Sequence, residues 1–300
     1  MTPQTWMITK NTRIEGYVWE KPALREGQLP WYPNTRPAIL ICPGGGYFHV
    51  SAREAEPVAM RFYAQGYQVF VLTYSVQDAS AYPAPWVEAS RAMRFIRFHA
   101  DKWSIDPEKV AIAGFSAGGH LAAWLSSSFD DQELLSYERE AVLHNSFYEG
   151  ETSAISEVPN RPDGCLLAYA VTDIKNKALE TSDNLTPERI IAELGYMPGK
   201  IVMEQRPDCS PIDRVTKAHP PTFIWATAED SIVPPDQSLR YAVELIRNGV
   251  KTEVHIFPEG GHGLSTADHV SCCDQREVPV RTKQWMGLAQ DFFDDLFHVN

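Results

Sequence analysis

The 300-residue sequence is short of the features that mark several specialised classes of protein. Its 5 cysteines form no C-x-x-C pair and are odd in number, so we expect neither a zinc ribbon nor a complete disulfide framework. No run rich in Lys and Arg offsets the net charge of -12. Such a chain would repel a nucleic acid or an anionic membrane surface, which excludes both as principal partners.

Long apolar segments of the kind found in secretion signals and membrane spans are also scarce. Residues 1–20 are polar and contain no apolar core, so we expect no signal peptide and a cytoplasmic location. Residues 110–129 carry no formal charge, yet glycines and serines interrupt them. We interpret this segment as a buried strand, a turn and a helix rather than as a membrane span.

The pattern of apolar residues indicates an α/β fold. Apolar residues make up 44% of the chain, and short runs rich in β-branched residues alternate with longer helical patterns. Several runs are apolar on both faces, which is typical of parallel strands covered by helices on each side. The sequence therefore predicts a doubly wound, mostly parallel sheet. The predicted strands are Ala38–Cys42, Gln68–Tyr74, Val110–Ala113, Gly164–Tyr169, Thr222–Ala226 and Thr252–Phe257.

Two of the predicted helices have recognisable ends. In the first, apolar residues recur at helical spacing between Ala89 and Trp103, and the pattern stops before a turn signal at Asp106-Pro107. The second covers residues 236–248, with Gly249 where a left-handed C-terminal cap belongs. The buried face predicted for this second helix consists of Leu239, Ala242, Val243 and Ile246.

The chain shows no internal repeat and no low-complexity linker, so we expect residues 1–300 to form a single domain. Two segments, about 130–162 and 174–220, lack a strong strand pattern, although Pro187–Leu194 is compatible with a short helix. We interpret both segments as insertions over one end of the sheet. Each segment could equally form a lid or an ordinary surface loop.

The most specific motif is a G-x-S-x-G sequence, Gly114-Phe115-Ser116-Ala117-Gly118. A predicted strand precedes it and a helical pattern follows it, which is the context of a nucleophile elbow. The small residues allow a sharp turn that leaves the serine side chain exposed above the sheet. The same residues could also form a plain small-residue turn, but the context favours Ser116 as a nucleophile.

A serine hydroxyl needs a base and an acid that orients the base, and on this fold they follow the serine in the order acid, then histidine. His262 follows a predicted strand within a glycine-rich loop and is the preferred base. His255 lies inside that strand and His269 lies further along the loop. Asp230 follows the preceding strand and is the preferred acid, with Asp173 as its rival.

Acyl transfer also needs N–H donors aimed at the developing oxyanion. The run Pro43-Gly44-Gly45-Gly46-Tyr47 ends a predicted strand and can present the backbone N–H groups of Gly45 and Gly46. The N–H of Ala117 would join them behind the nucleophile. A simple tight turn or a phosphate loop are the alternatives, but neither G-x-x-x-x-G-K-S/T nor G-x-G-x-x-G supports phosphate binding.

These motifs resemble those of α/β-hydrolase esterases related to hormone-sensitive lipase, above all their bacterial branch of acetyl esterase and acetylxylan esterase-like proteins. The resemblance implies an α/β-hydrolase fold and a serine carboxylesterase that needs no metal or cofactor. Its substrates would be short acyl esters, often acetyl groups on sugars or xylan fragments. The matching segments, in order between about residues 38 and 290, are 43–47, 106–107, 114–121, 160–162, 220–223, 230–234 and 255–263.

One position departs from this family's pattern. Lipase relatives often carry His-Gly-Gly-Gly, whereas Pro43 stands in the place of the histidine here. Because the oxyanion donors are backbone groups, we expect the oxyanion hole to form without that histidine side chain. We do not extend the substrates of those lipases to this chain. Tyr47, Tyr82 and Trp86, together with Phe48, are candidates to line a pocket for a small-molecule or oligosaccharide ester, with plain packing as the alternative.

Two other functions remain compatible with the sequence. A serine peptidase of the same fold would use the same triad, and a ligand-binding relic of a hydrolase would have lost part of it. The cluster His269, Cys272, Cys273 and Asp274 contains metal-ligand types, but adjacent cysteines ligate a single tetrahedral ion poorly. We therefore expect no metal site.

Overall fold

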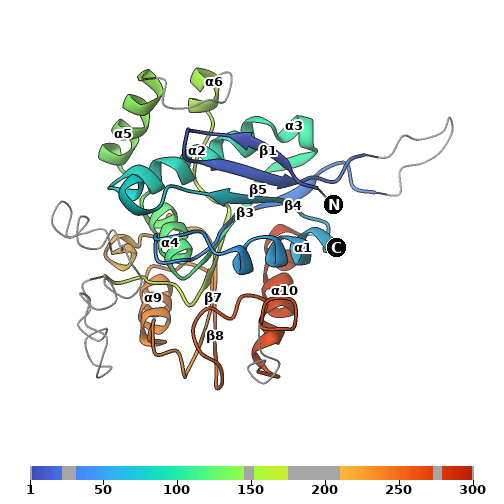
Figure 1. The fold of residues 1–300 in the computed structure, drawn as a ribbon, viewed down its shortest axis with the longest axis vertical. Helices are drawn as coiled ribbons and strands as arrows, with labels where there is room; N and C mark the ends of the chain where they lie inside the picture. Colours follow the sequence, from blue (N-terminus) through green and yellow to red (C-terminus); the bar gives the residue numbers. More distant parts are fainter. Residues whose placement is uncertain (1, 22–31, 145–151, 175–209, 273–278, 299–300) are drawn as a thin grey trace.

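The computed structural model describes residues 2–21, 32–144, 152–174, 210–272 and 279–298. These residues contain an eight-stranded sheet with the strand order β1-β2-β4-β3-β5-β6-β7-β8 (Figure 1). Strand β2 pairs antiparallel with β1 and with β4, and every other pairing is parallel. The strands are β1 Gln4–Met7, β2 Arg13–Tyr17, β3 Arg36–Cys42, β4 Gln68–Thr73, β5 Ile105–Phe115, β6 Gly164–Ala168, β7 Thr222–Thr227 and β8 Thr252–Phe257.

The six strands predicted from apolar runs are confirmed, and the predicted fold class is correct. The prediction missed β1 and β2, which are short, carry polar residues and have exposed positions, so they lack an apolar run. The turn expected at Asp106-Pro107 is wrong, because β5 already begins at Ile105. Ile105 pairs with Arg36 of β3, and the register shifts before Ala38.

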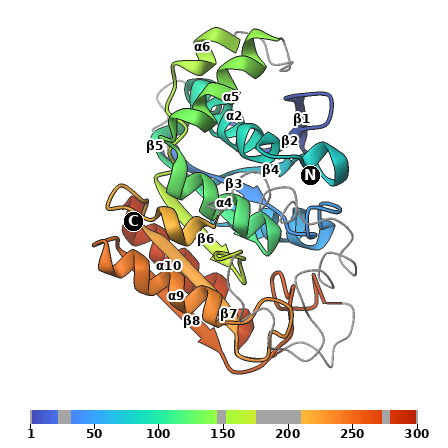
Figure 2. The ribbon, with the colours of Figure 1, turned by 90° about the vertical axis from the view of Figure 1, so that its left-hand side faces the viewer.

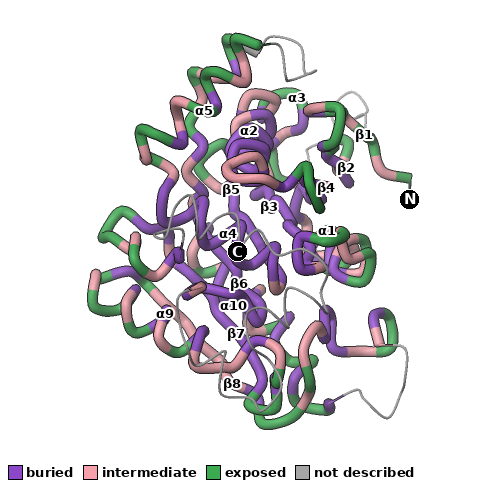
Figure 3. Tube along the Cα trace, turned by 60° about the vertical axis from the view of Figure 1, so that its left-hand side comes forward, coloured by how far each residue is buried: buried purple, intermediate pink, exposed green. Residues whose placement is uncertain are grey.

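Helices cover both faces of the sheet, as a doubly wound fold requires (Figure 2). Side chains of α2, α4 and α9 pack on one face, and those of α1 and α10 pack on the other. Buried residues accordingly concentrate along the central strands (Figure 3). The described helices are α1 Glu56–Ala64, α2 Ala84–Phe98, α3 Ala100–Trp103, α4 Ala117–Ser128, α5 Gln132–Leu143, α6 Thr152–Ser156, α9 Asp236–Arg247 and α10 Trp285–Phe297, with short 3-10 helices η1 Ala52–Glu54, η2 Gln77–Ser80, η4 Pro211–Arg214 and η6 Thr282–Gln284.

Helix α9 has the predicted length and cap but a different buried face. Gly249 has a φ of 75° and its N–H bonds the carbonyl of Ile246, which is the expected cap. Three residues of the predicted face are exposed, however, and Tyr241 and Leu245 are buried instead. Buried Gln237 in the first turn bonds the backbone of residues 172 and 173, which fixes the rotation of the helix. The exposed residues are Leu239, Val243 and Ile246.

The segment 110–129 forms the end of β5 and the helix α4, so its interpretation as strand, turn and helix is confirmed. None of the helices in the described ranges is both long and apolar enough to cross a membrane. Of the two expected insertions, 130–162 contains α5 and α6, which pack on α2. The helix expected at residues 187–194 lies outside the described residues.

A buried histidine three residues before β7, His219, predicts a measurable dependence of stability on pH. His219 donates from Nδ1 to the carbonyl of Pro220 and accepts at Nε2 from the hydroxyl of Tyr241, both at 2.9 Å. Burial lowers the pKa of His219 from 6.5 to about 4. The unfolded chain therefore takes up a proton at a higher pH than the folded chain, so stability is full above pH 6.5 and is lost as the pH falls toward 4.

Between about pH 7.5 and about pH 5, this histidine should lower the free energy of unfolding by about 2 kcal/mol. Urea unfolding of the wild type and of His219→Gln at both pH values measures that share, because other titrating groups contribute equally to both proteins. The variant should lose about 2 kcal/mol less than the wild type. Equal losses in the two proteins would contradict the buried, neutral state of His219.

Candidate active site

Ser116 occupies a strained turn between β5 and α4. Its backbone has φ 52° and ψ −116°, a conformation rare for a residue with a side chain. The turn is held by the Ser116 N–H, which donates to the carbonyl of Ala168 at 3.0 Å, and by the Ser116 carbonyl, which accepts from the His120 N–H at 2.9 Å. This is the nucleophile-elbow geometry expected from the G-x-S-x-G motif.

The glycines around Ser116 are required by close backbone contacts. A Cβ at Gly118 would lie 2.0 Å from the carbonyl oxygen of Cys42 and 2.3 Å from that of Pro43. A Cβ at Gly114 would lie 2.2 Å from the carbonyl oxygen of Gly118. The absence of side chains thus lets the start of α4 touch both its own strand and the glycine-rich loop after β3.

Replacing Gly118 by alanine should therefore lower the free energy of unfolding by about 2 kcal/mol or more, because backbone must move to admit the methyl group. Gly287 in helix α10 is the matched control, since nothing lies within 4 Å of a Cβ built there. Gly287→Ala should be neutral or stabilising by up to about 1 kcal/mol. Chemical denaturation of both variants measures the difference, and equal stabilities would contradict the close packing at Gly118.

The structure brings the predicted serine, histidine and acid into one hydrogen-bonded chain. His262 Nε2 lies 2.7 Å from Ser116 Oγ, and His262 Nδ1 lies 2.7 Å from Asp230 Oδ2. The three residues follow strands β5, β7 and β8, so they meet at the carboxyl edge of the parallel strands. With Nδ1–H donated to the carboxylate, Nε2 is left to accept the serine proton.

Asp230 is held in place by its own loop as well as by the histidine. Its second carboxylate oxygen accepts the N–H groups of Ile232 and Val233 at 3.0 and 2.9 Å. The residue is 4% exposed, so water competes little for the bond to His262. This arrangement leaves one oxygen free to orient the imidazole.

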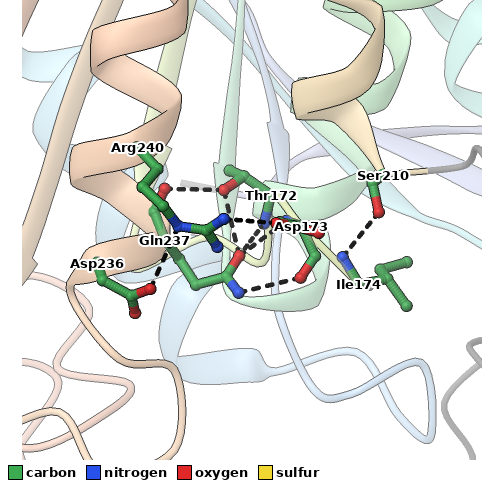
Figure 4. Close-up of polar contacts among 7 residues, drawn as sticks. All are labelled: Thr172, Asp173, Ile174, Ser210, Asp236, Gln237 and Arg240. Carbon is green, nitrogen blue, oxygen red and sulfur yellow. Dashed lines mark hydrogen bonds and ion pairs between the residues drawn. The ribbon is translucent and has the colours of Figure 1, made fainter. Parts of the chain in front are cut away.

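The rival residues lie in other contacts. Asp173 bonds Arg240 at 2.7 Å within a cluster around Gln237 at the start of α9 (Figure 4). His255 lies in β8 with its Nε2 2.7 Å from Glu253. His269 is exposed on the surface. The structure thus brings Asp230 and His262 to Ser116, and it does not bring the rival acid or bases there.

The loop after β3 has the form of an oxyanion loop. Gly45 and Gly46 have φ values of 119° and 62°, which favour glycine. The carbonyl of Gly45 accepts the N–H groups of Phe48 and His49, and this tight turn fixes the loop. In the described part of the chain, no bond engages the N–H groups of Gly45, Gly46 or Ala117. Ala117 is the first residue of α4, where backbone N–H groups lack partners within the helix.

The three aromatic residues expected to bind substrate differ in their surroundings. Trp86 has no exposed surface and lies within the core. Its side chain therefore contributes to core packing and does not line a substrate pocket. Tyr47 is 2% exposed, and its hydroxyl lies 2.8 Å from His120 Nδ1, which makes it a support of the glycine loop. Tyr82 stacks on Trp124 and lines an open cavity.

Tyr82 and Phe48 line two neighbouring cavities. The first has a volume of about 510 Å³ and includes Tyr82. The second includes Phe48, which is 44% exposed and lies three residues after Gly45. Both cavities have polar as well as aromatic walls. Asn11, Ser75 and Ala79 line both cavities, and neither cavity is lined by Ser116, Asp230 or His262.

The residue types that bind metals do not gather within the described ranges of the chain. No group of three or more His, Cys, Asp or Glu side chains there could hold an ion. Of the cluster noted in the sequence, Cys273 and Asp274 lie outside the described residues.

Two buried residues of the site, Glu54 and Tyr169, were missed by the sequence analysis. The Tyr169 ring lies edge-on against His262 with a centroid distance of 5.0 Å. Glu54 is 4% exposed and bonds the N–H of Gly44. No local motif marks either residue. Two weak features of the sequence could have suggested them as candidates: an acidic residue shortly after a glycine-rich loop, and a tyrosine at the end of a predicted strand.

A mostly parallel sheet whose strand β5 ends in a strained serine turn defines the chain as an α/β hydrolase. Within that class, it belongs to the BD-FAE family, whose model matches residues 30–245. The resemblance to α/β-hydrolase esterases stated from the sequence is thereby confirmed at the level of the family.

Individual relatives agree with this assignment. The chain is 34% identical over 236 residues to a protein of Butyrivibrio fibrisolvens named endo-1,4-beta-xylanase B, a match that covers 78% of this chain and 33% of the relative. It is 28% identical over 253 residues to Esterase LipC of Mycobacterium tuberculosis, covering 81% of this chain and 56% of that protein. The chain thus spans about a third and just over half of these relatives.

A solved structure matches over nearly the full length of both chains. It is the crystal structure of an acetyl ester-xyloside bifunctional hydrolase from Caldicellulosiruptor lactoaceticus, with a TM-score of 0.72 and 28% sequence identity. The alignment covers 99% of this chain and 98% of the other. The relatives therefore include proteins named as esterases and hydrolases of acetyl esters.

Proposed function

We propose that the protein is a serine carboxylesterase that hydrolyses short acyl esters, with acetyl as the preferred acyl group. The observation that carries the proposal is the chain of two 2.7 Å hydrogen bonds from Ser116 through His262 to Asp230. All three groups needed to activate a serine are present and aligned. The names of the relatives support an ester as the substrate.

In the first half of the reaction, Ser116 Oγ attacks the carbonyl carbon of the ester while His262 Nε2 takes the hydroxyl proton. Asp230 stabilises the imidazolium that forms. The ester C–O bond then breaks, and His262 gives its proton to the departing alkoxide. The products of this half are an alcohol and an acyl group bound to Ser116.

The second half repeats these steps with water as the nucleophile. His262 takes a proton from water as its oxygen attacks the acyl carbon, and then returns a proton to Ser116 Oγ as the acid leaves. In both halves, the negative oxygen of the tetrahedral intermediate would accept the N–H groups of Ala117 and of Gly45 or Gly46. Each such donor is typically worth about 2.7–4 kcal/mol in the transition state.

For the alcohol part of the ester, we propose a saccharide that extends from Ser116 past Phe48 into the two cavities that Phe48 and Tyr82 line. Their mixed walls suit a sugar, because the ring faces are apolar and the hydroxyls need polar partners. Phe48 and Tyr82 are the aromatic walls, from the second and the first cavity respectively. The similarity to the acetyl ester-xyloside bifunctional hydrolase supports acetylated xylo-oligosaccharides as the class to test.

The test is a substrate panel. Hydrolysis of p-nitrophenyl acetate, butyrate and octanoate is compared with acetate release from acetylated xylo-oligosaccharides, using wild-type protein and Phe48→Ala. The proposal predicts that kcat/KM falls as the acyl chain lengthens and that acetate is released from the sugars. It also predicts that Phe48→Ala weakens activity on the sugars more than on p-nitrophenyl acetate. Turnover of N-acetylated peptides in place of esters would favour the serine peptidase alternative.

A further inference from the structure

A buried carboxylate links the two sides of the active site. Glu54, from the short helix η1, is 4% exposed. Its Oε2 accepts the N–H of Gly44 at 2.7 Å, and its Oε1 accepts the hydroxyl of Tyr169 at 2.7 Å. Each carboxylate oxygen therefore binds a different wall of the site.

The contact with Gly44 acts on the oxyanion side. A Cβ built on Gly44 would lie 3.0 Å from Ser116 Cβ and 2.8 Å from the Phe115 carbonyl oxygen, so this backbone lies directly against the nucleophile. By engaging the N–H of Gly44, Glu54 fixes the residue that precedes the two candidate donors, Gly45 and Gly46.

The contact with Tyr169 acts on the histidine side. Burial and the adjacent Glu54 carboxylate raise the pKa of Tyr169 well above its ordinary value, so the hydroxyl keeps its proton and donates it to Glu54. The same hydroxyl accepts the N–H of Ser265 at 3.0 Å. Ser265 is three residues beyond His262, and the Tyr169 ring packs edge-on against the imidazole.

Neighbouring bonds tie η1 to the same loop. Ser265 Oγ donates to the carbonyl of Arg53 at 2.5 Å, and the Arg53 guanidinium donates to the carbonyl of Gly263 at 2.5 Å. The loop that carries His262 is thus bound to η1 at several points. Glu54 is the member of η1 that also reaches the glycine loop after β3.

We propose that Glu54 is a positioning residue that, through Gly44 and Tyr169, holds the oxyanion donors and His262 together in the geometry that Ser116 requires. This inference rests on the proposed serine esterase function. It assigns to Glu54 an effect on catalysis without contact to the substrate. A displacement of about 1 Å among reacting groups can cost about 10²-fold in rate, so the loss of this link should be seen in kcat.

The experiment compares Glu54→Gln, Glu54→Ala, Tyr169→Phe and the Glu54→Gln/Tyr169→Phe double variant in hydrolysis of p-nitrophenyl acetate. A fluorophosphonate, with labelling run to completion, counts the competent sites, and kcat is expressed per labelled site. Glu138→Gln and Tyr241→Phe are matched controls, because the first neutralises a buried carboxylate and the second removes a buried hydroxyl, and both groups bond away from the triad.

We expect Glu54→Gln to lower kcat per site by about 10- to 100-fold with KM changed by less than about 3-fold. Glu54→Ala should lose more, since glutamine can still accept the Gly44 N–H. The double variant should be no more than about 2-fold worse than Glu54→Gln, because both residues act in one chain. The two control variants should keep the wild-type kcat per site.

A kcat per site within about 2-fold of wild type in Glu54→Gln and Tyr169→Phe would overturn the proposal, as would fully multiplicative losses in the double variant. If Glu54→Gln yields no folded protein, Tyr169→Phe alone decides, since it removes one hydroxyl and keeps the ring. The absence of ester turnover in the wild type would instead refute the proposed function, so the two failures are distinguishable.

Discussion

Replacing Ser116 by alanine is expected to lower kcat/KM for p-nitrophenyl acetate by about 10⁴- to 10⁶-fold, the largest loss that one substitution in this chain should cause. The variant keeps the His262–Asp230 pair and the oxyanion donors but has no oxygen to form the acyl-enzyme. Only the catalysis that these remaining groups give to direct attack by water should persist. Steady-state hydrolysis with protein of known concentration measures the loss.

Ser126→Ala is the matched control for this variant. Ser126 is a fully buried serine on the same helix, α4, and it bonds neither His262 nor the glycine loop in the described part of the chain. It should keep kcat/KM within about 3-fold of the wild type. An activity of Ser116→Ala close to that of Ser126→Ala would mean that the ester is cleaved elsewhere.

Replacing Asp230 by asparagine should lower kcat by about 10⁴-fold, with the protein folded. The amide would donate to His262 Nδ1, so the imidazole proton would move to Nε2, which could then no longer accept the proton of Ser116. The bonds of Ile232 and Val233 to the other oxygen can persist in the variant. Its far-ultraviolet circular dichroism should therefore match the wild type while kcat falls.

Asp173→Asn tests whether that effect is specific to the acid in the triad. Asp173 also follows a strand of the sheet, β6, but it pairs with Arg240 at 2.7 Å. Its replacement should lower stability slightly and leave kcat within about 3-fold of the wild type. A loss in Asp173→Asn as large as that in Asp230→Asn would contradict the assignment of the acid.

The central part of the fold was predictable because its signals are local. Parallel strands buried on both faces read as continuous apolar runs, and the turn at Ser116 needs glycines at fixed spacing. The order of the candidate serine, acid and histidine along the chain follows from the fold, and the structure brings the three together.

Features that depend on tertiary contacts were not predictable in this way. Strands β1 and β2 are short and partly exposed, so their pairing with β4, not an apolar run, creates them. The rotation of α9 follows from Gln237, whose side chain bonds backbone 64 and 65 positions earlier. The aromatic character of Trp86 is visible in the sequence, but its complete burial is not.

The link made by Glu54 shows the same limit at the site itself. Its two carboxylate bonds reach Gly44, 10 positions away, and Tyr169, 115 positions away. Contacts at such separations have no fixed spacing in a sequence, so only the folded chain brings them together. The triad, in contrast, could be proposed from motif order before any contact was known.

The most direct test of the account is to identify the residue that a fluorophosphonate labels. Wild-type protein is treated with the probe, digested and analysed by peptide mass spectrometry, with and without prior incubation with an excess of p-nitrophenyl acetate. The account predicts one adduct, on Ser116, that forms more slowly in the presence of the ester and is absent from Ser116→Ala. An unlabelled Ser116 in folded wild-type protein, or an adduct on another residue, would contradict the claim that Ser116 is the nucleophile.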